Sequence, residues 1–166
     1  MQEGSWLQTF SHVVRLGLYL NTTSNPTTCF VPFHKFSHSV KSLHVTGIFL
    51  PRPHTFHLIY SLSLLENLTL EGGYAFGSSP PPAINPPTLT GTLNLDLLEG
   101  IKSFACGLLD LPNGLRFRKL ILACHHYEDF RWAQKLLAVC SGTIEEFDVA
   151  HRFPGTIFFF GHTLKL

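Results

Sequence analysis

One short pattern recurs along the chain and limits what it can fold into more than any other feature. The pattern is an apolar residue, two variable positions, leucine, one variable position and a final apolar residue. Six copies occur, at Val13/Leu16/Leu18, Val40/Leu43/Val45, Leu65/Leu68/Leu70, Thr90/Leu93/Leu95, Phe117/Leu120/Leu122 and Ile144/Phe147/Val149. The fourth copy is weaker, because threonine occupies its first position. The first positions are 27, 25, 25, 27 and 27 residues apart, and this even spacing predicts a structural repeat.

The form of the repeat predicts its architecture. Within each copy the last two apolar residues are two apart, as one face of a β-strand requires. A repeat of about 20–29 residues containing L-x-x-L-x-L is the signature of leucine-rich repeats, and stacked copies share a core that one copy cannot form alone. We therefore expect an α/β fold, a single leucine-rich-repeat-like solenoid over residues 1–166 with about six short parallel strands and convex helices or loops. The strands are expected near residues 13–19, 40–46, 65–71, 90–96, 117–123 and 144–150.

The segments between the strands predict helices in three of the repeats. Apolar residues recur at helical spacing in 54–64, 101–109 and 129–140. Asp129 is expected to cap the start of the last helix. The segment 72–88 differs, because its density of proline and glycine excludes a helix and favours an extended loop. A domain boundary at this loop is the alternative, although repeats continue on both sides of it.

Two features predict an irregular solenoid with poorly capped ends. The ninth position of such repeats usually holds asparagine or cysteine. Here the ninth positions are Asn21, Ile48, Gly73, Leu98, His125 and Arg152. Only the first of these fits, so the hydrogen bonds that the ninth-position side chains usually make between coils must come from other groups. Solenoids also need polar end caps, yet Trp6, Leu7 and Phe10 lie near the start and the apolar run 157–160 lies near the end.

Composition is consistent with one domain and excludes several functions. The chain is 45% hydrophobic and 14% charged, below the quarter that is usual for soluble domains, so it relies on extensive burial. A formal net charge of +1 provides no electrostatic attraction for nucleic acid or an anionic membrane. There is no apolar run long enough to span a bilayer and no signal-peptide pattern. We expect an intracellular protein, cytoplasmic or nuclear, whose four scattered cysteines are reduced.

Alternate residues of each predicted strand point away from the core and form the candidate binding surface. In a solenoid these residues lie on the concave face. They are mostly small and polar, and their net charge is low. The residues expected to contact a protein partner are Arg15, Tyr19, His44, Thr46, Asn67, Thr69, Glu71, Asn94, Asp96, Lys119, Glu146 and Asp148. The alternative is that these positions are only the solvated side of a half-buried sheet.

The histidines and cysteines give weak signals for a metal or catalytic site. The candidate ligand groups are His34 with His38, His54 with His57, and Cys124 with His125 and His126. Zinc needs three or four convergent ligands; the two histidine pairs have no cysteine or acidic partner nearby in sequence, and neighbours in the third group point to opposite sides of a strand end. A catalytic set of Cys124, His125 and Asp129 meets the same difficulty and has no oxyanion loop. We expect no metal, no cofactor and no enzymatic activity.

The chain also resembles a known family. The runs LTGTLNLDLLEGI, LLDLPNGLRFRKLIL and HHYEDFRWAQKLLAVCSGTIEEFDV are similar to the C-terminal leucine-rich part of the F-box-like protein family of mushroom-forming (basidiomycete) fungi. VKSLHVTGIFL and LENLTLEG match the same style, so the resemblance covers about Val40 to Gly155. It implies a substrate-recognition solenoid. In complete members this solenoid follows an N-terminal F-box, which recruits a cullin-type ubiquitin ligase through an adaptor. No F-box pattern precedes Val13, which argues against adaptor and cullin binding by this chain.

The sequence therefore favours one function and leaves two alternatives. The favoured function is a non-enzymatic protein–protein interaction module, resembling the substrate-recognition part of an F-box ubiquitin-ligase receptor. One alternative is a metal-dependent or Cys/His hydrolase-like enzyme. The other is a truncated gene product without a selected function. A nucleic-acid or membrane partner is not expected.

Overall fold

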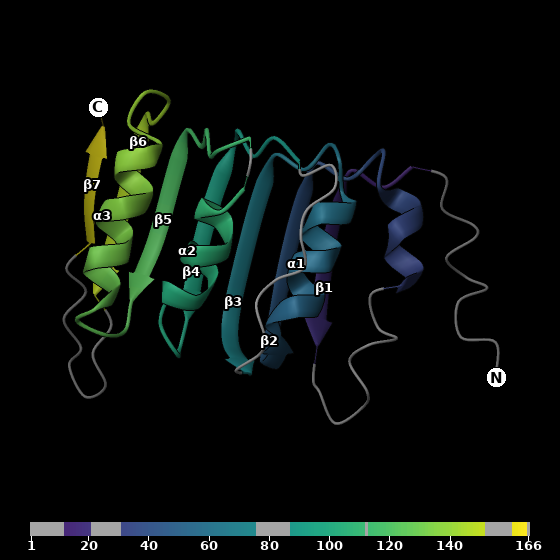
Figure 1. The fold of residues 1–166 in the computed structure, drawn as a ribbon, viewed down its shortest axis with the longest axis horizontal. Helices are drawn as coiled ribbons and strands as arrows, with labels where there is room; N and C mark the ends of the chain where they lie inside the picture. The colour runs from purple at the N-terminus through teal and green to yellow at the C-terminus, as the bar shows by residue number, and fades with distance from the viewer. Residues whose placement is uncertain (1–11, 21–30, 76–86, 112, 152–160, 166) are drawn as a thin grey trace.

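The described part of the chain forms one open sheet with helices on one side (Figure 1). The computed structural model describes residues 12–20, 31–75, 87–111, 113–151 and 161–165. The strands are β1 (Arg15–Leu20), β2 (Ser42–Pro51), β3 (Asn67–Ala75), β4 (Thr92–Leu97), β5 (Lys119–Cys124), β6 (Glu146–His151) and β7 (Gly161–Lys165). They lie side by side in the order of the sequence. Neighbours from β1 to β6 are parallel, and β7 is antiparallel to β6. The expected α/β class and the six parallel strands are therefore confirmed.

The register of the sheet is the one that the repeat predicts. Each parallel pairing places the second apolar residue of one copy beside that of the next, in the row Leu16, Leu43, Leu68, Leu93, Leu120 and Phe147. The third apolar residues form a second row, Leu18, Val45, Leu70, Leu95, Leu122 and Val149. In β2 to β5 every member of both rows is fully buried, whereas the members in β1 and β6 are only partly buried. The apolar rows are thus complete in the middle and weaker at both ends.

The helices lie on the face of the sheet to which these rows point (Figure 1). They are a short 3-10 helix η2 (Val31–Phe36), α1 (Arg52–Ser61), α2 (Lys102–Leu109) and α3 (Asp129–Val139). The three predicted helices are confirmed. α1 begins two residues and ends three residues before the expected range 54–64, and Leu62, which lies in that range, follows the helix and is buried in the core. η2 was not predicted.

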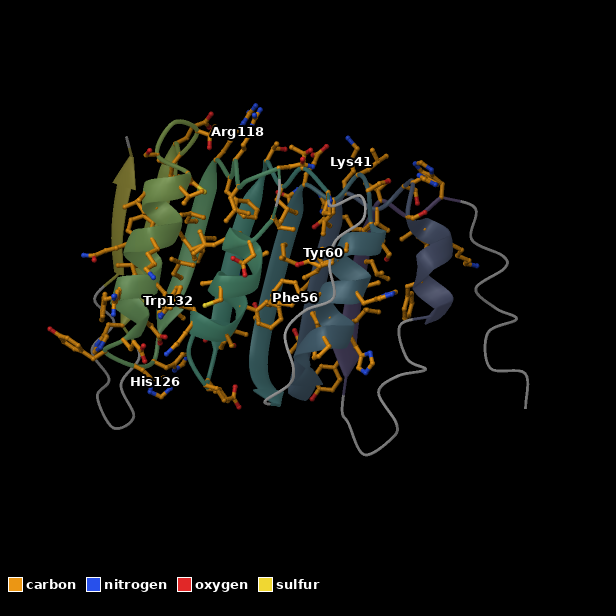
Figure 2. The ribbon with its side chains drawn as sticks, viewed as in Figure 1. Lys41, Phe56, Tyr60, Arg118, His126 and Trp132 are labelled. Carbon is orange, nitrogen blue, oxygen red and sulfur yellow. The ribbon has the colours of Figure 1, made fainter. Side chains whose placement is uncertain are left out.

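Contacts between successive helices join the repeats on this side. The rings of Phe56 in α1 and Phe104 in α2 stack with centroids 4.7 Å apart, and Figure 2 shows Phe56 between the two helices. Gly107 permits this approach, because a Cβ atom at that position would overlap the Phe56 ring. The hydroxyl of Tyr60 donates a hydrogen bond to the Gly107 carbonyl at 3.5 Å. α1 is therefore packed against α2 as well as against the sheet.

Several local expectations are corrected. β2 and β3 continue to Pro51 and Ala75, so the start of the segment 72–88, expected to be a loop, is strand. The pairing of β2 with β3 shifts register between Gly47 and Leu50, which the repeat did not predict. In the weak fourth copy Thr90 is half-exposed while Leu89 is fully buried, so the core residue is displaced by one position. β7 was not predicted, because it carries no copy of the repeat.

Other expectations fall on residues that the structure does not describe. These include Trp6, Leu7, Phe10, Asn21, Arg152, the apolar run 157–160 and most of the proline-rich segment, 76–86. Among the described helices, none has the length and apolar content needed to cross a bilayer.

Candidate functional site

The candidate site is the face of the sheet opposite the helices, called the open face here. Side chains of a strand point alternately to its two faces, and the burial pattern of β4 shows this alternation. Register places these residues in three rows across β1 to β6. The first row is Arg15, Ser42, Asn67, Thr92, Lys119 and Glu146; the second is Gly17, His44, Thr69, Asn94, Ile121 and Asp148; the third is Tyr19, Thr46, Glu71, Asp96, Ala123 and Ala150. All twelve residues expected to contact a partner lie in these rows.

A histidine on β2 connects three polar residues of the open face. Nε2 of His44 lies 3.2 Å from Oε2 of Glu71 on β3 and 2.9 Å from the hydroxyl of Thr46. All three side chains are at least partly exposed. A catalytic relay requires an imidazole to contact the nucleophile through one nitrogen and the carboxylate through the other. Here the same nitrogen faces both groups, so this cluster is a hydrogen-bonded polar patch rather than a relay.

A second histidine–carboxylate pair lies where β4 and β5 end. Nε2 of His125 lies 2.8 Å from Oδ1 of Asp96, and both side chains are largely covered. His125 occupies a ninth position of the repeat, and its side chain joins the end of β5 to β4. Its neighbour His126, at the same edge of the sheet (Figure 2), donates from Nε2 to the carbonyl of Leu98, another ninth position, at 2.9 Å. The sequence did not predict either contact, because the partners are separated by a whole repeat.

A lysine on β5 lies between two carboxylates of β6. Nζ of Lys119 lies 2.7 Å from Oε2 of Glu146 and 3.6 Å from Oδ2 of Asp148. The hydrogen bond with Glu146, opposed by partial burial and helped by both charges, raises the pKa of Lys119. Lys119 therefore remains a cation throughout the neutral range. These three residues form a charged group on the open face, with one cation between two carboxylates.

Asn67 has a structural contact in addition to its place on the open face. Its Oδ1 accepts a hydrogen bond from the backbone N–H of Thr92 at 2.8 Å. The side chain therefore ties the start of β3 to the start of β4. A polar residue expected to bind a partner thus also satisfies a backbone donor of the next repeat.

Asp129 is the buried polar residue that holds two repeats together, and its expected role is corrected. It lies in the first turn of α3, where the capping position is Glu128 and no side-chain cap is formed. Its Oδ2 instead accepts hydrogen bonds from the N–H groups of His125 and His126, at 3.0 and 2.9 Å. Its Oδ1 accepts one from the N–H of Ile101 at the start of α2, at 3.0 Å. With 1% exposure, this carboxylate links the segment before α2 to the turn before α3.

The proposed catalytic residues Cys124, His125 and Asp129 do not converge. The Cys124 side chain is fully buried, His125 reaches Asp96, and Asp129 binds backbone amides. Burial, with a smaller contribution from the charge of Asp129, raises the pKa of the Cys124 thiol to about 12. Such a thiol is protonated at neutral pH and is a poor nucleophile. In the described part of the chain, no group of three or more histidine, cysteine, aspartate or glutamate side chains is arranged to hold a metal ion.

We expect the raised pKa of Cys124 to weaken the fold in alkali. Between its ordinary value of 9.0 and about 12, the thiol ionises in the unfolded chain but not in the folded one. Unfolding then releases a proton, so the free energy of unfolding falls as pH rises, by up to about 1.4 kcal/mol per pH unit. Urea unfolding of the wild type and of Cys124→Ala from pH 8 to 10.5 measures the difference in slope. Equal slopes would contradict the expectation.

A shallow hollow on the helix side is a weaker candidate. It is lined by Tyr127, Glu128, Phe130, Arg131 and Gln134 around the start of α3. Most of these side chains are exposed, and Tyr127 is 85% exposed. The ion pair of Glu128 with Lys102, at 2.9 Å, also lies on the surface. The hollow contains none of the residues expected from the sequence to bind a partner.

Comparison of the chain with models of protein families, with curated proteins and with solved structures finds no match. The open face is therefore characterised by its own geometry and chemistry.

Proposed function

We propose that this protein is a non-enzymatic protein–protein interaction module whose open face holds the partner. In this proposal the sheet and its helices form a leucine-rich-repeat-like solenoid, and the open face is its concave binding surface. Support comes from the spacing of the repeat, the sequential parallel order of β1 to β6 and the location of the helices on a single face.

The observation that carries the proposal is an all-parallel run of strands with one uncovered face. Parallel sheets are almost always covered by helices on both faces, and their strands are then apolar on both sides. Here, in the described part of the chain, helices lie on one side only (Figure 1). The other side carries the polar and small residues of the three rows. A stacked-repeat protein has this arrangement, and such proteins use the free face for binding.

The resemblance to fungal F-box-like proteins extends the proposal to a specific role. The open face would then recognise a substrate that a cullin-type ubiquitin ligase modifies. Adaptor and cullin binding would depend on an F-box, which is a separate element from the open face. The role in substrate recognition can therefore be tested separately from ligase recruitment.

A photo-crosslinking residue on the open face should capture a partner that the same residue on the helix side does not. We place benzoylphenylalanine at Asn94, half-exposed in the middle of the open face, and in the control at Ala138, exposed on α3. After irradiation in an extract of a mushroom-forming fungus, we expect adducts from the first protein only. Excess unlabelled wild type should suppress them about tenfold, whereas Asn94→Arg should not, because a long charged side chain blocks the face.

The identity of the adducts then decides between the parts of the proposal. Adducts that occur equally at both positions, or that Asn94→Arg suppresses as well as the wild type, would refute binding by the open face. Co-purification of an adaptor and a cullin with the wild type would support the ligase role. Their absence, with a partner still captured at Asn94, would leave a recognition module that is not part of a ligase.

A further inference from the structure

The part of the open face that β3 to β6 form has a charge opposite to that of the whole chain. Its positions carry four carboxylates, Glu71, Asp96, Glu146 and Asp148, and one lysine, Lys119. With histidines counted as neutral, this region has a net charge of −3, whereas the chain has +1. The other cation of the three rows, Arg15, lies at the far end on β1. A partner that binds this part of the open face is therefore expected to be cationic.

The first acidic pair lies on adjacent strands. Glu71 on β3 and Asp96 on β4 are direct register partners, so their side chains leave the sheet next to each other. Like charges at directly opposed positions destabilise a sheet. A histidine lies beside each carboxylate, His44 at 3.2 Å and His125 at 2.8 Å. A lysine or arginine from a partner, placed above this pair, would offset the repulsion between the two carboxylates.

The second acidic pair lies two strands further on. Glu146 and Asp148 point to the same side of β6, two residues apart. Lys119 contacts both. One cation between two carboxylates leaves the group with a net negative charge. A second cation is therefore favoured here as well.

Part of the surface between the two acidic pairs is apolar. Ile121 on β5 is the large aliphatic side chain of the three rows, and it is half-buried. Ala123 follows on the same face and is 6% exposed, and Ala150 is its register partner on β6. These small side chains leave room above Ile121 for an aliphatic residue of a partner. The face thus presents an acidic, an apolar and a second acidic zone in sequence across the strands.

The spacing of the three zones matches an extended peptide. Neighbouring strands lie about 4.8 Å apart, so the midpoint of the Glu71/Asp96 pair is about 12 Å from β6 across the sheet. The pair is level with Ala150, two residues beyond Asp148, so the distance to the Asp148 position is about 14 Å. In an extended chain that rises about 3.3 Å per residue, side chains four residues apart point the same way and are about 13 Å apart. The residue midway between them also points the same way and would lie above β5.

We propose that the part of the open face formed by β3 to β6 binds an extended protein segment of the pattern basic–x–aliphatic–x–basic. The segment crosses the strands, with its basic side chains above the two acidic pairs and its aliphatic side chain on Ile121. This inference rests on the proposed function and specifies the chemistry of the partner.

Peptide titrations of the full chain followed by NMR test the pattern. The probe is a glycine- and serine-flanked peptide with the centre Lys-Ser-Leu-Ser-Lys, at low salt to limit screening. We expect it to shift the amide signals of Glu71, Asp96, Ile121 and Glu146, and to bind about tenfold more tightly than the peptide with Glu-Ser-Leu-Ser-Glu. A peptide of the same composition with the centre Lys-Lys-Leu-Ser-Ser should bind several-fold more weakly, because its lysines are too close together.

Matched variants separate the site from the overall charge. Glu71→Gln with Asp96→Asn should weaken binding of the basic peptide about tenfold. Glu128→Gln with Glu145→Gln removes the same charge from exposed positions outside the three rows and should leave binding unchanged. Equal effects of the two double variants, or equal binding of the basic and acidic peptides, would overturn the inference. Absence of peptide binding while the Asn94 crosslink persists would overturn it too, and would leave the proposed function standing.

Discussion

Replacing Asp129 by alanine should lower the free energy of unfolding by about 3–5 kcal/mol. The carboxylate is almost fully buried and accepts three backbone hydrogen bonds, from Ile101, His125 and His126. Alanine leaves these donors without an acceptor inside the protein, and each hydrogen bond to a charged group contributes about 1.5–3 kcal/mol. The loss affects two repeats, because one donor starts α2 and the other two precede α3. Urea denaturation followed by circular dichroism measures the change.

Two variants test whether hydrogen bonding by Asp129 is the cause. Asp129→Asn keeps one acceptor oxygen and should lose about 2 kcal/mol, between the wild type and alanine. Glu128→Ala changes the preceding residue, which is exposed and paired with Lys102 on the surface, and should have little effect. If the asparagine variant were as unstable as alanine, one acceptor oxygen would not be enough to hold the three backbone donors, and both carboxylate oxygens would be required. If Asp129→Ala unfolded like the wild type, the tie between repeats would be refuted.

The register of the sheet could be predicted from the sequence because one pattern repeats. Aligning the six copies places Leu43 beside Leu68 and Leu68 beside Leu93, and the same alignment places the outward residues in rows. Parallel order and burial of the middle strands follow, because each copy needs its neighbours to cover its apolar residues. The members of the open face were therefore predictable before any coordinates.

The contacts within those rows were not predictable, because they depend on side-chain directions across repeats. Asp129 looked like a local cap from its place at the start of a helix, but its partners lie in the preceding turn and in α2. His125 looked like an unsuitable ninth-position residue, yet its imidazole reaches Asp96 on the neighbouring strand. β7 carries no repeat, so nothing in the periodicity indicated that it would pair with β6. The repeat in the sequence thus predicts which residues share a row of the sheet, whereas the individual polar contacts can be identified only from the three-dimensional structure.

Gly72→Ala should be as damaging as the loss of Asp129, for a reason of shape rather than polarity. Gly72 has a φ of +107°, a backbone conformation that residues with a Cβ rarely adopt. It is also the register partner of Gly47, and a Cβ atom at position 72 would overlap the Gly47 carbonyl oxygen. Neither backbone can move without disturbing the pairing of β2 with β3. The strain and the clash together should lower the free energy of unfolding by about 3–5 kcal/mol.

Gly17 on β1 provides the matched control. A Cβ atom there meets nothing within 4 Å, and its φ is not positive. Gly17→Ala should therefore change the free energy of unfolding by less than about 0.5 kcal/mol. Both variants are compared with the wild type by urea denaturation. A loss below about 1 kcal/mol for Gly72→Ala would mean that β2 and β3 can separate at little cost. That result would contradict the close approach of β2 and β3 at this position. The rows of the open face depend on that approach.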